Sequence, residues 1–184
     1  FQVFQYDFSR ESVGGIASEI VKEADKNPWV KAVEIYHCIS SFSTTALCEG
    51  LDSLAPNIQV FGGIVCSPDI TSPNSCVFSS VGGYTKSGLL VVFYGGDDLY
   101  IESRKISGWK PIGRNFHVTR SEGNILYELG GVPAYEVYNK YLNIKNDNNF
   151  FYNALEFPML YEHNGVSIVR AAGASNPDGS LSMS

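Results

Sequence analysis

The sequence predicts an α/β segment followed by an α+β segment, in which strand–helix–strand–helix–strand leads into an antiparallel β meander with one or two short helices. Three observations support this prediction. In the first third, apolar residues switch between strand and helix spacing. Later, short β-branched and aromatic runs are separated by paired glycines, and a proline begins a helical pattern near residue 133. We expect a division into residues 1–70 and 71–184, either as two parts or as one compact unit that shares a sheet.

The first segment alternates strands with helices. Val3–Tyr6 is a short apolar strand, and a helix follows whose apolar positions recur at intervals of three and four residues: Val13, Ile16, Ile20 and Ala24. Asn27–Pro28 ends this helix, because the residue before a proline avoids the helical region. A strand, a helix and a strand then follow at Lys31–Cys38, at Ser43 or Thr44 to about Leu54, and at Ile58–Cys66. This order favours parallel pairing through right-handed crossovers.

The second segment follows a loop of Pro, Ser, Asn and Thr residues at Ser67–Ser75 and has mostly the pattern of β-structure. We expect antiparallel strands at Cys76–Val81, Leu89–Tyr94, Leu99–Ile106, Phe116–Thr119 and Ile125–Leu129. Two short helices are expected at Pro133–Leu142 and Phe150–Leu155. The Asn164–Gly165 pair is a strong hairpin signal, so it should join strands at Met159–Tyr161 and Val166–Ala171.

Composition excludes several classes of function. A hydrophobic content of 44% in 184 residues is enough to build a sizeable core. The net charge of −6 argues against non-specific binding to nucleic acid or to an anionic membrane, because both need a basic face. The longest apolar run, Leu89–Tyr94, is far shorter than the ~20 residues of a membrane-spanning helix. We therefore expect no nucleic-acid partner and no membrane insertion by this segment.

No group of residues has the pattern of a catalytic or metal site. His37 and Cys38 are neighbours on an expected strand, so their side chains point to opposite faces and cannot form a catalytic pair. No Cys or His pair has metal-ligand spacing. The paired glycines form no G-x-G-x-x-G motif before a helix, and there is no G-x-S-x-G motif. We therefore expect no enzyme activity, no catalytic residue, no metal and no cofactor.

Residues 107–141 form the stretch that is densest in polar and aromatic side chains. Trp109 lies between a glycine and a proline, which makes a rigid corner that could line a pocket. Polar side chains then surround a glycine turn: Thr119, Arg120, Glu122 and Asn124. The guanidinium of Arg120 could hold a carboxylate with two parallel hydrogen bonds. The structural alternative is an ion pair of Arg120 with Glu122 or Glu128, with Trp109 as a core side chain.

A longer pattern runs through the same stretch. It consists of a Gly-Trp-x-Pro-x-Gly corner, a Thr-x-x-x-Gly-Asn strand and a Tyr-Glu-Leu-x-Gly-x-Pro-Ala segment, at Gly108, Trp109, Pro111, Gly113, Thr119, Gly123, Asn124, Tyr127, Glu128, Leu129, Gly131, Pro133 and Ala134. In this pattern the chain resembles the FIST domain, a sensory module of bacterial signal-transduction proteins that also occurs in F-box proteins. One departure is Gly130, which stands where the family pattern has Asp. Looser matches occur at Val60–Gly63 and Val169–Arg170.

The resemblance implies a cytoplasmic sensor without catalytic activity. Such a module binds a small metabolite, with amino acids as the proposed ligands, and is joined to an output signalling domain in the full-length protein. Residues 1–70 would correspond to the later part of the FIST N-terminal region and residues 71–184 to its C-terminal region. Because the chain lacks an initiator Met and any output part, we expect it to be a piece of a longer protein.

The residue chemistry and the resemblance together predict a ligand site near the Trp109 corner and the glycine turn at residue 123. Arg120 would anchor an anionic group, and Arg170 on a neighbouring strand is a second candidate for that role. Trp109 would form an apolar wall, while Thr119 and Asn124 would orient the ligand through hydrogen bonds. A pocket of this type is mostly apolar with a few converging polar groups.

A second function remains open, namely a non-catalytic protein-interaction platform as in the F-box relatives. The eleven tyrosines fit either a recognition surface or a core. Exposed aromatic side chains around Tyr135–Tyr141 would favour the platform, whereas an enclosed cavity would favour ligand sensing.

Overall fold

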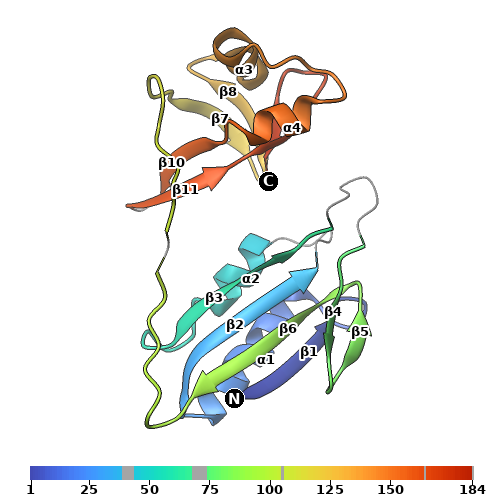
Figure 1. Ribbon diagram of the computed structural model, residues 1–184, viewed down its shortest axis with the longest axis vertical. Coiled ribbons are helices and arrows are strands. Elements are labelled where there is room, and N and C mark those ends of the chain that lie inside the picture. Colours follow the sequence, from blue (N-terminus) through green and yellow to red (C-terminus); the bar gives the residue numbers. More distant parts are fainter. Residues whose placement is uncertain (39–43, 68–73, 105, 164, 184) are drawn as a thin grey trace. The chain divides into compact units, whose positions relative to one another are not determined.

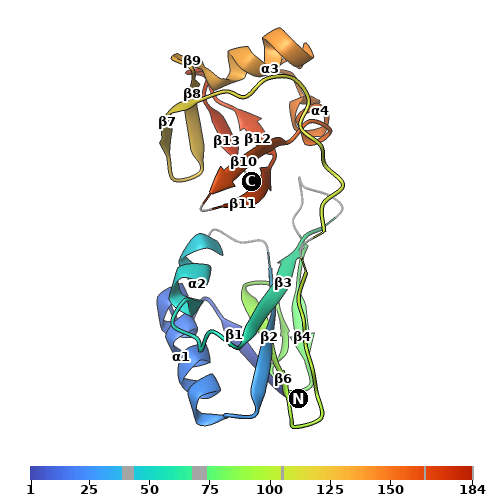
Figure 2. The same cartoon turned by 90° about the vertical axis from the view of Figure 1, so that its left-hand side faces the viewer.

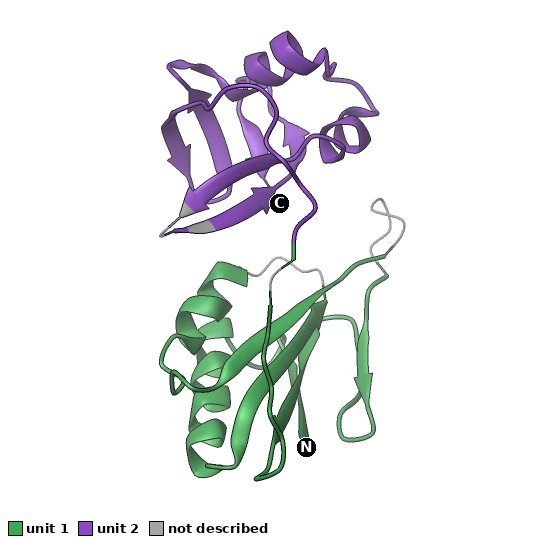
Figure 3. Cartoon of the chain, turned by 60° about the vertical axis from the view of Figure 1, so that its left-hand side comes forward, with its two compact units in different colours: residues 1–106 green, residues 107–184 purple. Residues whose placement is uncertain are grey.

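The chain forms two compact units, each with its own hydrophobic core. The computed structural model describes residues 1–38, 44–67, 74–104, 106–163 and 165–183. The two units are Phe1–Ile106 (unit 1) and Ser107–Ser184 (unit 2), shown in Figure 3. The fold class is the predicted one, with strand–helix–strand elements, antiparallel sheets and few short helices. The boundary expected between residues 70 and 71 lies outside the described residues, and the strands that follow it as far as residue 95 belong to unit 1.

Unit 1 is a sheet with helices on one face. Its elements are β1 (Gln2–Asp7), α1 (Val13–Lys26), β2 (Val30–Cys38), α2 (Thr44–Leu51), β3 (Gln59–Val65), β4 (Val77–Ser79), β5 (Gly83–Thr85) and β6 (Gly88–Gly95). The four-stranded sheet has the order β1-β6-β2-β3, and β4 pairs with β5 in a separate hairpin (Figure 1). β2 and β3 are parallel, as predicted, whereas β6 runs antiparallel between β1 and β2. Strands from both sides of residue 70 therefore share one sheet.

Helices α1 and α2 cover one face of this sheet (Figure 2). α1 begins after Ser12, whose side-chain oxygen accepts a hydrogen bond from the backbone N–H of Gly15 at 3.2 Å. Most of the predicted apolar stripe of α1 is buried: Ile16, Ile20 and Ala24. The stripe packs in one core with residues of β2 and β6: Val33, Ile35, Leu89, Val91 and Phe93. Only alternate strand residues face the helices, because successive side chains of a strand point to opposite faces.

The prediction of a strand at Leu99–Ile106 is wrong. The described residues of this range have no regular secondary structure, and none of the described strands pairs with them. Most of the apolar side chains that suggested a strand are exposed, Tyr100 at 84% and Ile106 at 92%. The segment is instead held by a polar contact, because Lys31 Nζ donates to the carbonyl oxygen of Leu99 at 2.6 Å. An apolar pattern forms a strand only where a partner supplies backbone hydrogen bonds.

The two neighbouring glycines of β3 differ in what an added side chain would meet. Gly62 has a φ of 154°, and a Cβ there would collide with the backbone of Ile35 on β2. A Cβ on Gly63 would meet nothing within 4 Å. We expect Gly62→Ala to lower the free energy of unfolding of unit 1 by roughly 1–3 kcal/mol. Gly63→Ala should instead raise it by roughly 0.4–1 kcal/mol, because alanine restricts the unfolded chain.

Urea denaturation measures this difference. Trp29 packs against the core of unit 1 and reports on its unfolding, once Trp109→Phe has removed the other tryptophan. Equal effects of the two glycine substitutions would contradict the close approach of β3 to the β2 backbone at Gly62.

Unit 2 is a small sheet with two short helices. Its elements are β7 (Val118–Glu122), β8 (Ile125–Leu129), β9 (Val132–Pro133), α3 (Ala134–Leu142), α4 (Phe150–Leu155), β10 (Met159–His163), β11 (Val166–Arg170), β12 (Ala172–Ser175) and β13 (Leu181–Met183). The five-stranded sheet has the order β12-β13-β8-β7, with β9 also paired to β8, and β10 and β11 form a separate hairpin. The hairpin predicted around Asn164–Gly165 is confirmed by the β10–β11 pairing, although Asn164 itself lies outside the described residues. Both predicted helices are confirmed as α3 and α4.

Helix α3 packs against the core of unit 2 with one of its faces. The buried members of this core include Leu126, Leu129, Ala134, Val137, Tyr138, Phe150, Ala154, Ala172 and Leu181. The Tyr138 ring contacts that of Phe150, with 6.4 Å between the ring centroids, and its hydroxyl donates to the carbonyl oxygen of Phe157 at 2.9 Å. Burial raises the pKa of Tyr138 to about 12, because an apolar environment disfavours the phenolate. The opposite face of α3 is left exposed.

Candidate functional site

A cleft of about 200 Å³ lies beside α3 in unit 2. Its walls come from the irregular segment before β7, from the end of β8 with the turn that follows, and from α3. The lining residues are Arg114, Phe116, Leu129, Gly130, Val132, Glu136, Val137, Lys140 and Tyr141. The cleft therefore combines apolar side chains with three charged ones.

Arg114 and Lys140 carry the positive charge of the cleft. Arg114 Nη2 donates to the hydroxyl of Tyr141 at 2.7 Å. Its Cζ lies 5.1 Å from the ring centroid of Phe116 and 5.5 Å from that of Tyr141, and Lys140 Nζ lies 5.4 Å from the latter. Aromatic rings attract cations at such distances. A guanidinium has five N–H donors, and the bond to Tyr141 uses one of them, so Arg114 is equipped to hold a carboxylate as well.

The order of residues in α3 explains why charged side chains line the cleft. The buried side of the helix is formed by Ala134, Val137 and Tyr138. Glu136 and Lys140 are four residues apart and both exposed, so they lie one turn apart on the same side of the helix. Glu136 is in the first turn and Lys140 in the last, which is the placement that the helix dipole favours for each charge.

A turn of two glycines joins β8 to β9 at the rim of the cleft. Gly130 and Gly131 have φ angles of 62° and 81°, in the left-handed region. The N–H of Gly130 donates to the carbonyl oxygen of His117 at 2.7 Å, and the N–H of Gly131 donates to Oγ1 of Thr119 at 3.1 Å. Asp also tolerates the left-handed conformation better than most residues. Glycine at position 130, in place of the Asp of the family pattern, is therefore compatible with the same turn.

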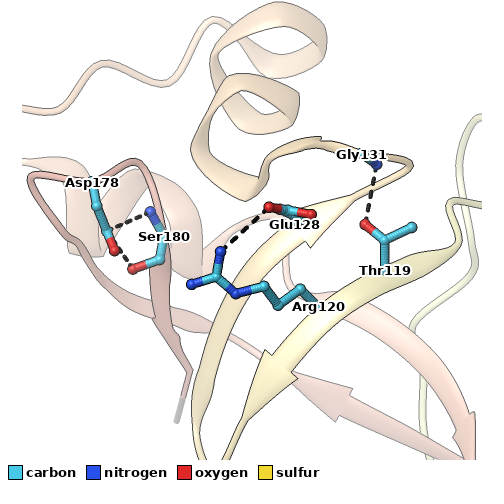
Figure 4. Close-up of polar contacts among 6 residues, drawn as sticks. All are labelled: Thr119, Arg120, Glu128, Gly131, Asp178 and Ser180. Carbon is cyan, nitrogen blue, oxygen red and sulfur yellow. Dashed lines mark hydrogen bonds and ion pairs between the residues drawn. The ribbon is translucent and has the colours of Figure 1, made fainter.

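Arg120, the predicted anion anchor, is engaged by neighbouring side chains (Figure 4). Its Nη1 lies 3.5 Å from Oε1 of Glu128, and its Cζ lies 4.1 Å from the ring centroid of Tyr127. Oδ1 of Asp178 accepts hydrogen bonds from the hydroxyl of Ser180 at 2.6 Å and from its N–H at 3.0 Å. These hydrogen bonds lower the pKa of Asp178, and the positive charge of Arg120 lowers it further by a smaller amount. Asp178 is therefore a second carboxylate whose charge interacts with that of Arg120. The contact with Glu128 is the one that the structural alternative predicted.

The other predicted ligand residues lie apart from the cleft. Trp109 is 52% exposed, so it is not a core side chain, and its backbone N–H donates to Oγ of Ser107 at 3.3 Å. Asn124 is exposed, and its Nδ2 donates to the carbonyl oxygen of Met183 at 3.4 Å. Arg170 is exposed at the end of β11. None of the five predicted residues, Thr119 and Arg120 included, lines the cleft beside α3. Their role in ligand binding stays a prediction.

Sequence reasoning missed the charged residues of the cleft, although part of the signal was present. Arg114 directly follows the Gly-Trp-x-Pro-x-Gly corner and comes two residues before Phe116. Glu136 and Lys140 have the spacing that places them on one side of the predicted helix. No sequence pattern indicated that Arg114 would lie beside α3. Arg114 and Tyr141 are 27 residues apart, and the contact between these two residues depends on how the chain between them packs.

Within the described ranges, no group of three His, Cys, Asp or Glu side chains is placed to hold a metal ion. None of the described helices combines the length and apolar character needed to cross a bilayer. All four cysteines are free thiols, with Cys38 buried and Cys48 and Cys66 exposed.

Comparison with known proteins identifies one similarity. The family model of the FIST N domain matches residues 6–132, which is more than half of the chain. No curated protein and no solved structure matches the chain.

Proposed function

Because the chain belongs to the FIST N domain family, whose members are sensory modules of signal-transduction proteins, we propose that it senses a small carboxylate-bearing metabolite, such as an amino acid. The cleft beside α3 is the binding site, with Arg114 as the anion anchor and Lys140 as a second cation. Ligand binding changes the activity of an output signalling domain, which belongs to the full-length protein in the cytoplasm. The protein acts as a receptor and not as an enzyme.

The contact between Arg114 and Tyr141 is the observation that supports this site most strongly. Arg114 belongs to an irregular segment, yet two aromatic rings and the Tyr141 hydroxyl hold its guanidinium against α3. A positioned guanidinium loses little side-chain freedom when it binds a carboxylate. Apolar walls strengthen that interaction, because they lower the local dielectric constant.

Arg120 is the rival anchor that the sequence suggested. Its guanidinium has a carboxylate neighbour in Glu128 and a second negative charge in Asp178, so a ligand carboxylate would have to compete with both. Arg114, in contrast, donates to a neutral phenol. The two arginines form a matched pair for mutagenesis, because each is exposed in unit 2 and each lies over an aromatic ring.

The alternative function, a protein-interaction platform, required exposed aromatic side chains around α3. Tyr138 is buried and Tyr135 is partly buried in the core of unit 2. Tyr141 is 48% exposed, but it lines the cleft. Two of the three tyrosines of α3 therefore fail this criterion, while the cleft beside them is open and is not the enclosed cavity that would favour ligand sensing.

A thermal-denaturation screen with the common amino acids and organic acids tests the proposal. We expect at least one compound to raise the melting temperature, because a hundredfold excess over Kd stabilises the folded state by about 2.7 kcal/mol, or several degrees at this size. Arg114→Ala should abolish the shift, and Arg120→Ala should retain it. Loss of the shift in Arg120→Ala alone would move the anchor to Arg120. A screen without any shift would contradict ligand sensing and favour the platform.

A further inference from the structure

We infer that the free edge of β3 in unit 1 is an interaction surface, and that its partner is the same edge of a second copy of this chain. The two β3 strands pair antiparallel about a two-fold axis at Gly62, so the four-stranded sheets of both copies form one continuous sheet. This surface belongs to unit 1, whereas the proposed ligand cleft belongs to unit 2. The inference therefore goes beyond the proposed function and does not depend on it.

β3 lies at the edge of the four-stranded sheet, with β2 on its inner side (Figure 1). None of the described strands pairs with its outer side. Among the described residues, none outside the sheet forms a hydrogen bond with the β3 backbone. A strand carries N–H and C=O groups on both sides, so the outer row of β3 is available to a further strand.

Two apolar side chains of β3 are exposed at this edge. Val60 is 43% and Ile64 is 50% exposed. Val60 is in register with Val33 of β2, which belongs to the core beneath α1 and α2, so both side chains lie on the face that these helices cover. The core itself does not include them. They therefore lie at its rim, where a second strand would remove them from water.

The absence of charge along this edge favours a second copy as the partner. Residues 57–67 contain no Lys, Arg, Asp or Glu and no proline, the residues that usually protect an exposed strand from pairing. The chain as a whole has a net charge of −6, so two copies repel each other over much of their surface. At β3 an identical edge brings no like charges together. The opposite edge of the sheet differs, because β1 ends at Asp7 and Gln5 Nε2 donates to the carbonyl oxygen of Gly82.

The order of residues in β3 is self-complementary about Gly62. In an antiparallel pair centred there, Val60 of each copy is opposite Ile64 of the other. Cross-strand pairs of apolar, β-branched side chains stabilise a sheet. On the other face, Phe61 of each copy is opposite Gly63 of the other, where a Cβ would meet nothing within 4 Å. An aromatic ring can therefore cover this glycine, an arrangement that stabilises strand pairing.

Sedimentation velocity of the whole chain at increasing concentration measures the association. We expect an equilibrium of monomer and dimer in the micromolar range. Val60→Lys should raise the dissociation constant about tenfold, because the new ammonium group would lose water beside Ile64 of the other copy. Val81→Lys is the matched control, because Val81 is 71% exposed between β4 and β5 of unit 1 and the substitution changes the net charge equally.

Two double variants test the register of the paired strands. In Val60→Glu with Ile64→Lys, the new carboxylate of each copy is opposite the new ammonium group of the other. Within one copy the two positions are roughly 13 Å apart along the strand, too far for an ion pair. In Val60→Lys with Ile64→Lys, like charges meet instead. We expect the first variant to have a dissociation constant about tenfold lower than the second, and circular dichroism shows whether each variant is folded.

The behaviour of the wild-type chain and these variants decides between an interface at β3 and other modes of association. A wild-type chain that stays monomeric at millimolar concentration would overturn the inference as a whole. Equal weakening by Val60→Lys and Val81→Lys would place the interface away from β3. Equal dissociation constants of the two double variants would overturn the antiparallel register about Gly62. None of these results changes the expected response of unit 2 to a ligand.

Discussion

We expect the replacement of Tyr138 by alanine to lower the free energy of unfolding of unit 2 by about 3–5 kcal/mol. The ring is 2% exposed, contacts Phe150 and donates its hydroxyl to the carbonyl oxygen of Phe157. The substitution leaves a cavity beneath α3 and an unpaired backbone carbonyl, both of which are unfavourable in a packed core. Because α3 supplies one wall of the cleft, any stabilisation by ligand should disappear as well.

Hydrogen exchange of the β8 backbone amides, followed by mass spectrometry, measures the stability of unit 2 by itself. Tyr138→Phe keeps the ring and loses only the hydroxyl, so we expect a smaller cost of about 1–2 kcal/mol. Tyr152→Ala on α4 is the control, because Tyr152 is 56% exposed and an exposed side chain contributes within about 0.5 kcal/mol. A loss in Tyr138→Ala no larger than in Tyr152→Ala would show that Tyr138 does not support the core.

We expect the replacement of Phe93 by alanine to lower the free energy of unfolding of unit 1 by a similar amount, about 3–5 kcal/mol. Phe93 is fully buried on β6, and its ring centroid lies 4.9 Å from that of Phe4 on β1. β6 lies between β1 and β2, so the cavity would form at the centre of the sheet, where neighbouring strands cannot collapse into it. Large-to-small substitutions cost most where the surrounding structure relaxes least.

Urea denaturation followed by Trp29 fluorescence, in the Trp109→Phe background, measures the effect of Phe93→Ala. Phe78→Ala is the matched control, because Phe78 belongs to the same unit but is 73% exposed. We expect this control to change the free energy of unfolding by less than about 0.5 kcal/mol. Similar effects of the two substitutions would argue against β6 as a central strand of unit 1.

Several elements were predictable because their signals lie between residues close in the chain. The four-residue spacing of Ile16, Ile20 and Ala24 indicated α1 and its buried face. The Asn164–Gly165 pair indicated the hairpin that joins β10 to β11. Strand–helix–strand order also indicated the parallel pairing of β2 with β3.

Pairing between distant strands was less accessible to sequence reasoning. Nothing near Leu89–Tyr94 indicates that this strand inserts between β1 and β2, because the order of strands in a sheet depends on contacts across the whole unit. The same limit explains the error at Leu99–Ile106. Its apolar residues have the pattern of a strand, but whether a strand forms depends on a partner that the segment itself does not encode.

The sequence by itself determined the fold class through apolar spacing and paired glycines. It also determined the family and the expectation of a ligand sensor, which depend on the Gly-Trp-x-Pro-x-Gly corner and the segments that follow it in fixed order. Only the tertiary structure decided which polar side chains meet. It brings Arg120 to Glu128 and Arg114 to Tyr141 on α3, which adds the cleft beside α3 as a second candidate site next to the one predicted at the glycine turn of residue 123. The physical reason is that backbone preferences and amphipathic spacing act between near neighbours in the chain, whereas a cleft is formed by side chains that packing brings together from distant positions.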